Sequence, residues 1–167
     1  KVRPVAIEDL LGRPQKPLDR VSMAGLIKGK KVLITGAGGS IGSELVRQIC
    51  DLEPAELSLL DSSEYNLYSI EMKISVTHPD LVRRAIITDV RDRQAIYRLF
   101  SDVSPDLVFH AAALKHVPLV EENPCEGVLT NVVGTTNVAD ACVKTGVSTM
   151  VMISTDKAVN PTNVMGA

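Results

Sequence analysis

Tryptophan is absent from this chain of 167 residues, and aromatic residues make up only 3% of it. A core with few large rings must be built from aliphatic side chains, and apolar residues account for 45% of the sequence. No apolar run reaches the roughly 20 residues that a membrane-spanning helix needs, and no signal-peptide pattern is visible. We therefore expect the chain as given to form a soluble, cytoplasmic domain with an aliphatic core.

Cysteine and histidine are also scarce, with three of each. Cys50, Cys125 and Cys142 are scattered and odd in number, which is typical of buried, reduced thiols and not of a disulfide framework. The histidines have no cysteine or carboxylate partners at metal-ligand spacing. We therefore expect no metal site.

The chain lacks an excess of charge of either sign: its 18 Lys and Arg nearly balance 20 Asp and Glu, and the net charge of −2 gives no basis for nucleic-acid binding. The distribution is uneven, because residues 1–31 contain eight Lys or Arg against three Asp or Glu, and the remainder contains ten against seventeen. Residues 1–30 are predicted to be a basic extension that packs on the domain formed by residues 31–167. The extension is either a solvated arm, which the composition favours, or a stretch close to an anionic membrane surface.

From Lys31 onward, continuous apolar segments alternate with amphipathic ones. The predicted strands are Lys31–Thr35, Glu56–Asp61, Ala85–Asp89, Leu107–Ala111 and Thr149–Ser154, and the predicted helices lie near Ser40–Asp51, Ser63–Ser75, Asp92–Phe100 and Pro124–Thr145. This alternation indicates an α/β fold with a parallel sheet covered on both faces. Right-handed crossovers give the strand order 3-2-1-4-5 of a doubly wound Rossmann sheet. Such folds usually continue to a sixth strand, so we expect the chain to stop before a C-terminal substrate-binding part.

A glycine-rich turn follows the first predicted strand directly. Gly36 permits a tight turn, Gly39 lets the backbone approach a pyrophosphate, and Gly42 lets the next helix pack closely on the strand. The N–H groups and positive dipole end of that helix would face two phosphates. The turn therefore predicts an NAD(P)-binding domain, with cofactor contacts from Gly36, Gly38, Gly39, Ser40, Ile41 and Gly42.

Acidic residues end the second and third predicted strands. Asp61 is placed to accept both hydroxyls of the adenosine ribose and to repel a 2′-phosphate, which favours NAD over NADP. It is equally placed to cap the helix at Ser62-Ser63. Asp89 and Val90 end the third strand, where such folds hold the adenine, but Asp89 also suits a helix cap near Asp92.

Small residues end the fourth strand, where they let the nicotinamide half of a dinucleotide lie against the backbone. We assign Ala111 and Ala112 to the cofactor, and Ala113 and Lys115 to the substrate, since a lysine there reaches a phosphate as a point charge. Lys115 is otherwise a solvated surface lysine.

Asn131 lies inside a long predicted helix, although asparagine is a poor helix former. It therefore indicates a local kink or a polar contact, and we assign it to the cofactor site.

The fifth strand ends in Ser154-Thr155-Asp156-Lys157, which brings a hydroxyl, an acid and a base to the carboxyl edge of the sheet. Together with the stretch Ala111–Pro118, this sequence resembles the extended short-chain dehydrogenase/reductases. More narrowly, it is similar to the nucleotide-sugar 4,6-dehydratases of the bacterial CapD-like polysaccharide-biosynthesis family. The resemblance extends to Ile7–Arg13, Thr35–Gly42, Leu60-Asp61, Asn131 and Ser154–Ala167.

The resemblance implies a reaction on a UDP-linked N-acetylhexosamine such as UDP-N-acetylglucosamine. Hydride would leave C4 for the nicotinamide, water would be eliminated across C5 and C6, and hydride would return to C6. Lys157 would be the general base, Asp156 the general acid, and Thr155 would lie near the sugar 4-hydroxyl. The product would be a 4-keto-6-deoxy sugar nucleotide.

Met165 departs from the family pattern, because it occupies the position of the tyrosine in the usual Tyr-x-x-x-Lys pair and cannot transfer a proton. Methionine in this catalytic position resembles the long, membrane-anchored branch of the family. That branch implies a parent protein at the cytoplasmic face of the bacterial inner membrane, and such domains often pair into homo-oligomers through their long helices.

Two other functions stay open at this point. A sugar-nucleotide 4-epimerase or reductase uses the same scaffold, although epimerisation does not need the adjacent acid and base at Asp156 and Lys157. A non-catalytic NAD(P)-binding module is suggested by Met165, but it would give Asp156 and Lys157 no role.

Overall fold

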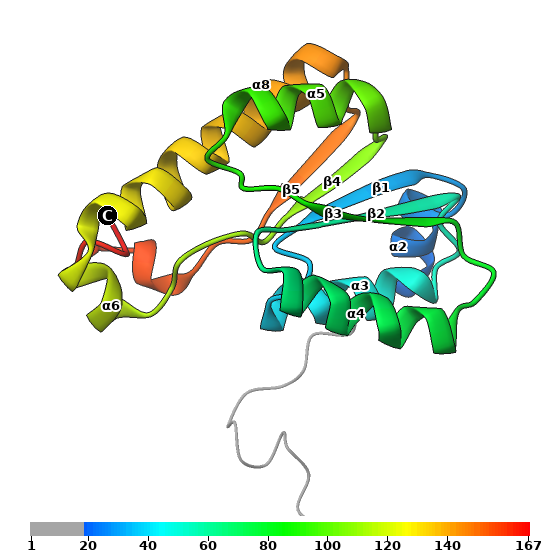
Figure 1. Ribbon diagram of the computed structural model, residues 1–167, viewed down its shortest axis with the longest axis horizontal. Helices are drawn as coiled ribbons and strands as arrows, with labels where there is room; N and C mark the ends of the chain where they lie inside the picture. The colour runs from blue at the N-terminus through cyan, green and yellow to red at the C-terminus, as the bar shows by residue number, and fades with distance from the viewer. Residues whose placement is uncertain (1–18) are drawn as a thin grey trace, which may run out of the picture.

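The computed structural model describes residues 19–167, which form a single parallel sheet with helices on both faces (Figure 1). The strand order is β3-β2-β1-β4-β5, as the sequence predicts. The strands are β1 (Lys31–Thr35), β2 (Glu56–Asp61), β3 (Arg83–Ile87), β4 (Leu107–His110) and β5 (Thr149–Met152). All four neighbouring pairs are parallel, so the carboxyl ends of the strands meet at one edge of the sheet.

The helices divide into two layers around this sheet, as Figure 1 shows. They are α2 (Arg20–Ile27), α3 (Ser40–Cys50), α4 (Glu64–Thr77), α5 (Arg93–Val103), α6 (Val117–Glu122), α7 (Pro124–Gly127) and α8 (Thr135–Thr145), with a π-helical turn η1 (Val128–Gly134) and a 3-10 turn η2 (Asp156–Ala158). Helices α3 and α4 cover one face, and α5 and α8 cover the other. No helix within residues 19–167 combines the length and apolar character needed to cross a membrane.

Alternating side chains of the central strand β1 supply both cores. Val32 and Ile34 point into the core under α3 and α4, whereas Leu33 joins the core under α5 and α8. Because both faces of the strand are covered, its apolar run is continuous. Because both of its faces are packed, the end of β1 is held in place, and so is the start of the glycine turn that follows it.

Helix α2 ties part of the predicted N-terminal extension to the domain. The side chain of Asp19 caps the helix by accepting the N–H of Ser22 at 3.0 Å, and Ile27 at the other end is only 2% exposed within the first core. The leader motif Ile7–Arg13 lies outside the described residues.

The third strand begins two residues earlier than Ala85 and ends two residues before Asp89, so its predicted bounds are wrong. The apolar residues Ala85 to Ile87 suggested the later start. Within residues 19–167, β3 pairs only with β2, and both of its arginines pair with carboxylates: Arg83 lies against α4 and pairs with Glu71 at 2.8 Å, and the half-exposed Arg84 pairs with Glu56 at 2.7 Å. The early end leaves residues 88–90 free to form a loop at the edge of the sheet.

Three smaller expectations also need correction. The fourth and fifth strands end one and two residues earlier than predicted, at His110 and Met152, and the long helix from Pro124 is interrupted by the π-helical turn. All three cysteines are free. Cys50 and Cys142 are buried as expected, and burial raises the pKa of each thiol to about 11. Cys125 is exposed on the short helix α7, so its predicted burial is wrong.

Candidate functional site

The glycine turn between β1 and α3 is held by close backbone contacts on three sides. Gly36 has a φ of +66°, and a Cβ there would lie 2.7 Å from the amide nitrogen of Ala112. A Cβ on Gly38 would lie 2.5 Å from the Cβ of Asn66 on α4. A Cβ on Gly42 would overlap the carbonyl oxygen of Gly36 and lie 2.7 Å from its carbonyl carbon. The turn therefore requires glycine at these positions, because a side chain would push the turn away from Ala112 or from α4, or push α3 away from the turn.

Asp61 fastens the same turn to the end of β2. It is 9% exposed, its Oδ2 accepts the N–H of Gly38 at 2.9 Å, and its Oδ1 accepts the N–H of Ser63 at 2.9 Å. Helix α4 is capped by Ser63, whose hydroxyl accepts the N–H of Asn66, so the capping role suggested for Asp61 is wrong. Each carboxylate oxygen keeps a second lone pair, which is available to a ligand hydroxyl in the adjoining cleft.

Asp89 and Arg91 form a second polar group beyond the end of β3. The Oδ1 of Asp89 accepts the N–H of Arg91 at 2.9 Å, and its Oδ2 lies 2.6 Å from Nη2 of the same arginine. Hydrogen bonding from the Arg91 side chain holds the pKa of Asp89 below its usual value. Helix α5 is capped by Asp92, so Asp89 does not cap it. Nη1 of Arg91 reaches Glu126 on α7 at 2.5 Å and thereby bridges two elements.

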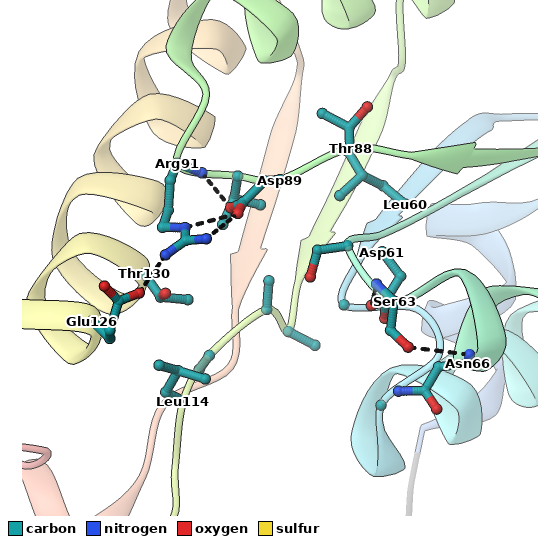
Figure 2. Close-up of a pocket in the computed structure, with 17 residues that line it drawn as sticks. Leu60, Asp61, Ser63, Asn66, Thr88, Asp89, Arg91, Leu114, Glu126 and Thr130 are labelled. Atoms are coloured by element: carbon teal, nitrogen blue, oxygen red, sulfur yellow. Dashed lines mark hydrogen bonds and ion pairs between the residues drawn. The ribbon is translucent and has the colours of Figure 1, made fainter. Parts of the chain in front are cut away.

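These groups line one cleft of about 430 Å³ at the carboxyl edge of the sheet (Figure 2). Asp61, Ser63 and Asn66 form one wall, and Asp89, Arg91 and Glu126 lie across from them. The lining residues are Gly36, Gly39, Leu60, Asp61, Ser62, Ser63, Asn66, Thr88, Asp89, Val90, Arg91, Ala111, Ala112, Ala113, Leu114, Glu126 and Thr130.

The sequence predicts eight of these lining residues and misses nine. Gly36, Gly39, Asp61, Asp89, Val90 and the three alanines from Ala111 are on the wall as expected. Ser62, Ser63, Thr88, Arg91 and Leu114 lie within two residues of predicted ones, so widening each strand end would have found them. Glu126 and Thr130 come from a helix, and no local sequence signal marks them. Among the described residues, Gly38, Ser40, Ile41, Gly42, Lys115 and Asn131 lie outside this lining.

Asn131 reaches the cleft only through the backbone of another residue. Its Oδ1 accepts the N–H of Leu114 at 2.8 Å, and its Nδ2 donates to the carbonyl oxygen of Leu114 at 2.9 Å. Of the predicted kink or polar contact, the polar contact is therefore confirmed, and the residue lies in the π-helical turn η1. Asn131 thus shapes the loop after β4, which carries the three alanines.

Lys115 lies in a neighbouring hollow of about 400 Å³, next to the main cleft. Its lining residues are Ala113, Leu114, Lys115, His116, Leu119, Val120, Asn123 and Glu126. Ala113, Leu114 and Glu126 belong to both hollows, so the two are continuous. The structure therefore places the two predicted substrate residues together, beside the predicted cofactor residues.

The predicted catalytic residues form an exposed turn after β5. The hydroxyl of Thr155 accepts the N–H of Lys157 at 3.3 Å and donates to Oδ1 of Asp156 at 3.2 Å. A Cβ on Gly166 would overlap the carbonyl oxygen of Lys157, so the segment carrying Met165 lies directly against this turn. This segment is also anchored to α6, where Glu121 accepts the N–H of Val164 at 2.6 Å, and Figure 1 shows the C-terminus beside that helix. Residues 155–157 lie at the same edge of the sheet as the cleft, outside its lining.

A family model described as "polysaccharide biosynthesis protein" matches residues 32–167, which include all but the first residue of the sheet, the cleft and the turn after β5. The chain belongs to this polysaccharide biosynthesis family. The resemblance noted from the sequence is therefore confirmed at the level of the family.

Two relatives illustrate the range of the family. EpsC of Bacillus subtilis, named a probable polysaccharide biosynthesis protein, is 49% identical over 168 residues, which cover 100% of this chain and 28% of EpsC. A UDP-N-acetylglucosamine 4,6-dehydratase (inverting) of Campylobacter jejuni is 40% identical over 143 residues, 85% of this chain and 41% of that enzyme. The chain thus spans less than half the length of either relative.

Solved structures share the fold. Pen from Bacillus thuringiensis is 34% identical, with a TM-score of 0.77 over 84% of this chain and 43% of that one. A UDP-glucose 4-epimerase from Stenotrophomonas maltophila, solved with bound NAD and formylated UDP-arabinopyranose, is 26% identical with a TM-score of 0.69, covering 77% of this chain and 38% of that one. Family members and structural neighbours therefore include both dehydratases and epimerases.

His110 is a buried titratable residue immediately before the alanines of the cleft. It is 3% exposed, and its ring nitrogens lie 2.7 Å from the hydroxyl of Thr35 and 2.9 Å from that of Thr135. Burial lowers the pKa of His110 to about 4. A neutral imidazole has one donor and one acceptor, which suits two hydroxyl partners. The residue therefore links the end of β1 to the helix that follows the π-helical turn.

Acidification is expected to destabilise the fold through His110. The unfolded histidine takes up a proton below pH 6.5, whereas the folded one does so only near pH 4. This contribution to the free energy of unfolding is therefore complete above pH 6.5, falls by up to about 3 kcal/mol as the pH drops, and levels off below pH 4. Urea unfolding at pH 7, 5.5 and 4 measures it. His110→Gln should flatten the profile and the exposed-site control His116→Gln should retain it; an unchanged profile in His110→Gln would refute the assignment.

Proposed function

We propose that this chain is the dinucleotide-binding part of a nucleotide-sugar 4,6-dehydratase that acts on UDP-N-acetylglucosamine or a close relative. The observation that carries the proposal is the position of Asp156 and Lys157 at the same sheet edge as the cleft of Asp61 and the glycine turn. The similarity to a UDP-N-acetylglucosamine 4,6-dehydratase over 85% of this chain supports it.

The residues of the cleft fit an NAD molecule. Gly36 and Gly39 present backbone without side chains, and the N-terminus of α3 directs free N–H groups toward the space where a pyrophosphate would lie. Asp61 is nearly buried and keeps lone pairs for the ribose hydroxyls, and its negative charge would repel the 2′-phosphate of NADP. NAD is therefore the favoured cofactor in this proposal.

When bound, the nicotinamide supplies the hydride acceptor for C4 of the sugar and the hydride donor for C6. Oxidation at C4 releases the hydroxyl proton to solvent and acidifies the proton on C5, which Lys157 removes as the general base. Asp156 gives a proton to the departing 6-hydroxyl, so that water leaves and the double bond forms between C5 and C6. After hydride has been added to C6, Lys157 returns a proton to C5, and Asp156 takes up a proton from solvent for the next turnover. Thr155 orients Asp156 through its hydroxyl, which lies 3.2 Å from Oδ1.

The proposal also gives a role to Met165, which lies beside the turn of Asp156 and Lys157. Its half-buried side chain carries no ionisable proton, so it can pack against the turn and exclude water without competing for the sugar hydroxyl. In this proposal the proton transfers rest on Asp156 and Lys157. In this proposal the complete protein works at the cytoplasmic face of the bacterial inner membrane.

An NMR assay of the full-length parent protein in deuterated water tests the proposal. With NAD and UDP-N-acetylglucosamine, we expect a new 6-deoxy methyl signal together with deuterium at C5. Formation of the C4 epimer alone would support the epimerase alternative. A bound cofactor with unchanged sugar would refute the substrate and reaction, and absence of NAD binding would refute the cofactor assignment itself.

A further inference from the structure

The loop that follows β3 is held by one continuous helical segment, α7–η1–α8. Asn137 on α8 is 4% exposed, and its Nδ2 donates to the carbonyl oxygens of Val90 at 3.0 Å and Arg91 at 3.1 Å. A Cβ on Gly134 would lie 2.7 Å from Cγ2 of Val90, so the helix touches that side chain directly. Glu126, eleven residues before Asn137, holds the guanidinium of Arg91 from the other side.

The loop has two other supports: the N–H of Thr88 donates to the carbonyl oxygen of Asp61 at 3.1 Å, and the Val90 side chain is buried in the core under α5 and α8. Strand β3 has a single neighbour in the described sheet and ends at Ile87, before the loop begins. The loop nevertheless supplies four consecutive residues to the wall of the cleft, from Thr88 to Arg91. At the far end of this wall the backbone is held by Asn137, whose side-chain amide satisfies the carbonyls of Val90 and Arg91 at once.

Two asparagines of this helical segment serve opposite halves of the cleft. Asn131 holds Leu114 after β4, on the side where a doubly wound sheet places the second mononucleotide of its ligand. Asn137 holds the loop after β3, on the side of β2 and Asp61 where the first mononucleotide lies.

We propose that Asn137 is a positioning residue for the adenosine half of the bound dinucleotide. Asn137 does not contact the ligand itself. It holds the backbone of Val90 and Arg91 and thereby keeps this wall of the cleft in the position that adenosine binding requires. The inference rests on the proposed binding of NAD in this cleft.

Calorimetric titration of the full-length protein with NAD and with ADP separates the two asparagines. Asn137→Ala is expected to raise the dissociation constants for both ligands by the same factor of about ten, because the lost hydrogen bonds affect only the shared half. Asn131→Ala is expected to weaken NAD and leave ADP unchanged. Thr136→Ala, an exposed residue between them whose hydroxyl bonds only within the helix, is the matched control and should behave as wild type.

The pattern of outcomes decides the inference. Unchanged ADP affinity in Asn137→Ala, or equal losses of ADP affinity in both asparagine variants, would overturn it. If wild-type protein binds neither ligand, the proposed function fails and not only the role of Asn137. Should Asn137→Ala fail to fold, Asn137→Ser is judged by the same ADP and NAD criterion, since its short hydroxyl cannot reach both carbonyls.

Discussion

In the complete protein, Lys157→Met is expected to lower the rate of dehydration by about 10²- to 10⁴-fold, the range typical of losing a general base. The methionine keeps a long, flexible side chain but cannot accept the C5 proton. Because Lys157 is exposed and contacts its surroundings mainly through its backbone, the fold should be unaffected. The measurement is NMR-detected formation of the 6-deoxy methyl group, with deuterium exchange at C5 followed in parallel.

The exchange measurement assigns the two adjacent residues separately. Lys157→Met should abolish both C5 exchange and the methyl signal, whereas Asp156→Asn should retain C5 exchange and lose the methyl signal. Lys73→Met, at an exposed lysine on α4, is the matched control and should be fully active. Persistent C5 exchange in Lys157→Met would contradict its role as the base.

Gly42→Ala is expected to abolish measurable NAD binding, with a dissociation constant raised at least about 100-fold, or to prevent folding. Its added Cβ would overlap the carbonyl oxygen of Gly36 and lie 2.9 Å from the Cα of Ala37, and all of these neighbours are backbone atoms. Helix α3 must therefore move away from the turn and take its N-terminal N–H groups with it. Overpacking of this kind costs about 1–3 kcal/mol even where side chains can adjust.

Gly25→Ala is the matched control, because the same change from glycine to alanine is expected to stabilise the protein at this position. Gly25 lies in α2 and has no atom within 4 Å of its added Cβ, so alanine there should raise the unfolding free energy by about 0.5–1 kcal/mol. Thermal unfolding and NAD titration of both variants are the measurements. Near-normal NAD affinity in Gly42→Ala would show that the turn tolerates more movement than its contacts suggest.

The strand order was predictable because short apolar segments alternate with amphipathic helices, and right-handed crossovers between parallel strands then give this order. The glycine turn was predictable for a related reason, since a strand followed by closely spaced glycines has few other structural explanations. The bounds of β3 were not predictable, because its first two residues are arginines. Their charges are neutralised by carboxylates on α4 and β2, which are distant in sequence.

The residues of the candidate site also divide into those that the sequence could predict and those that it could not. Asp61 and the alanines after β4 could be located from their strand ends, whereas Asn137 and Glu126 act across 46 and 35 residues of sequence. Asparagine within a helix indicates a polar contact, but nothing in the sequence identifies its partner. The capping roles suggested for Asp61 and Asp89 failed because Ser63, two residues after Asp61, and Asp92, three residues after Asp89, occupy the N-cap positions of α4 and α5.

The arginines of β3 also bear on the exposed edge of the described sheet. A strand with one neighbour leaves a row of unpaired backbone groups that invites pairing with another chain. Arg84 is half exposed and pairs with Glu56, so it places a charge beside this short edge that an incoming strand would have to desolvate, whereas Arg83 is turned onto α4. The charge disfavours strand addition at this edge, while the early end of β3 leaves the adjoining loop free for the cleft.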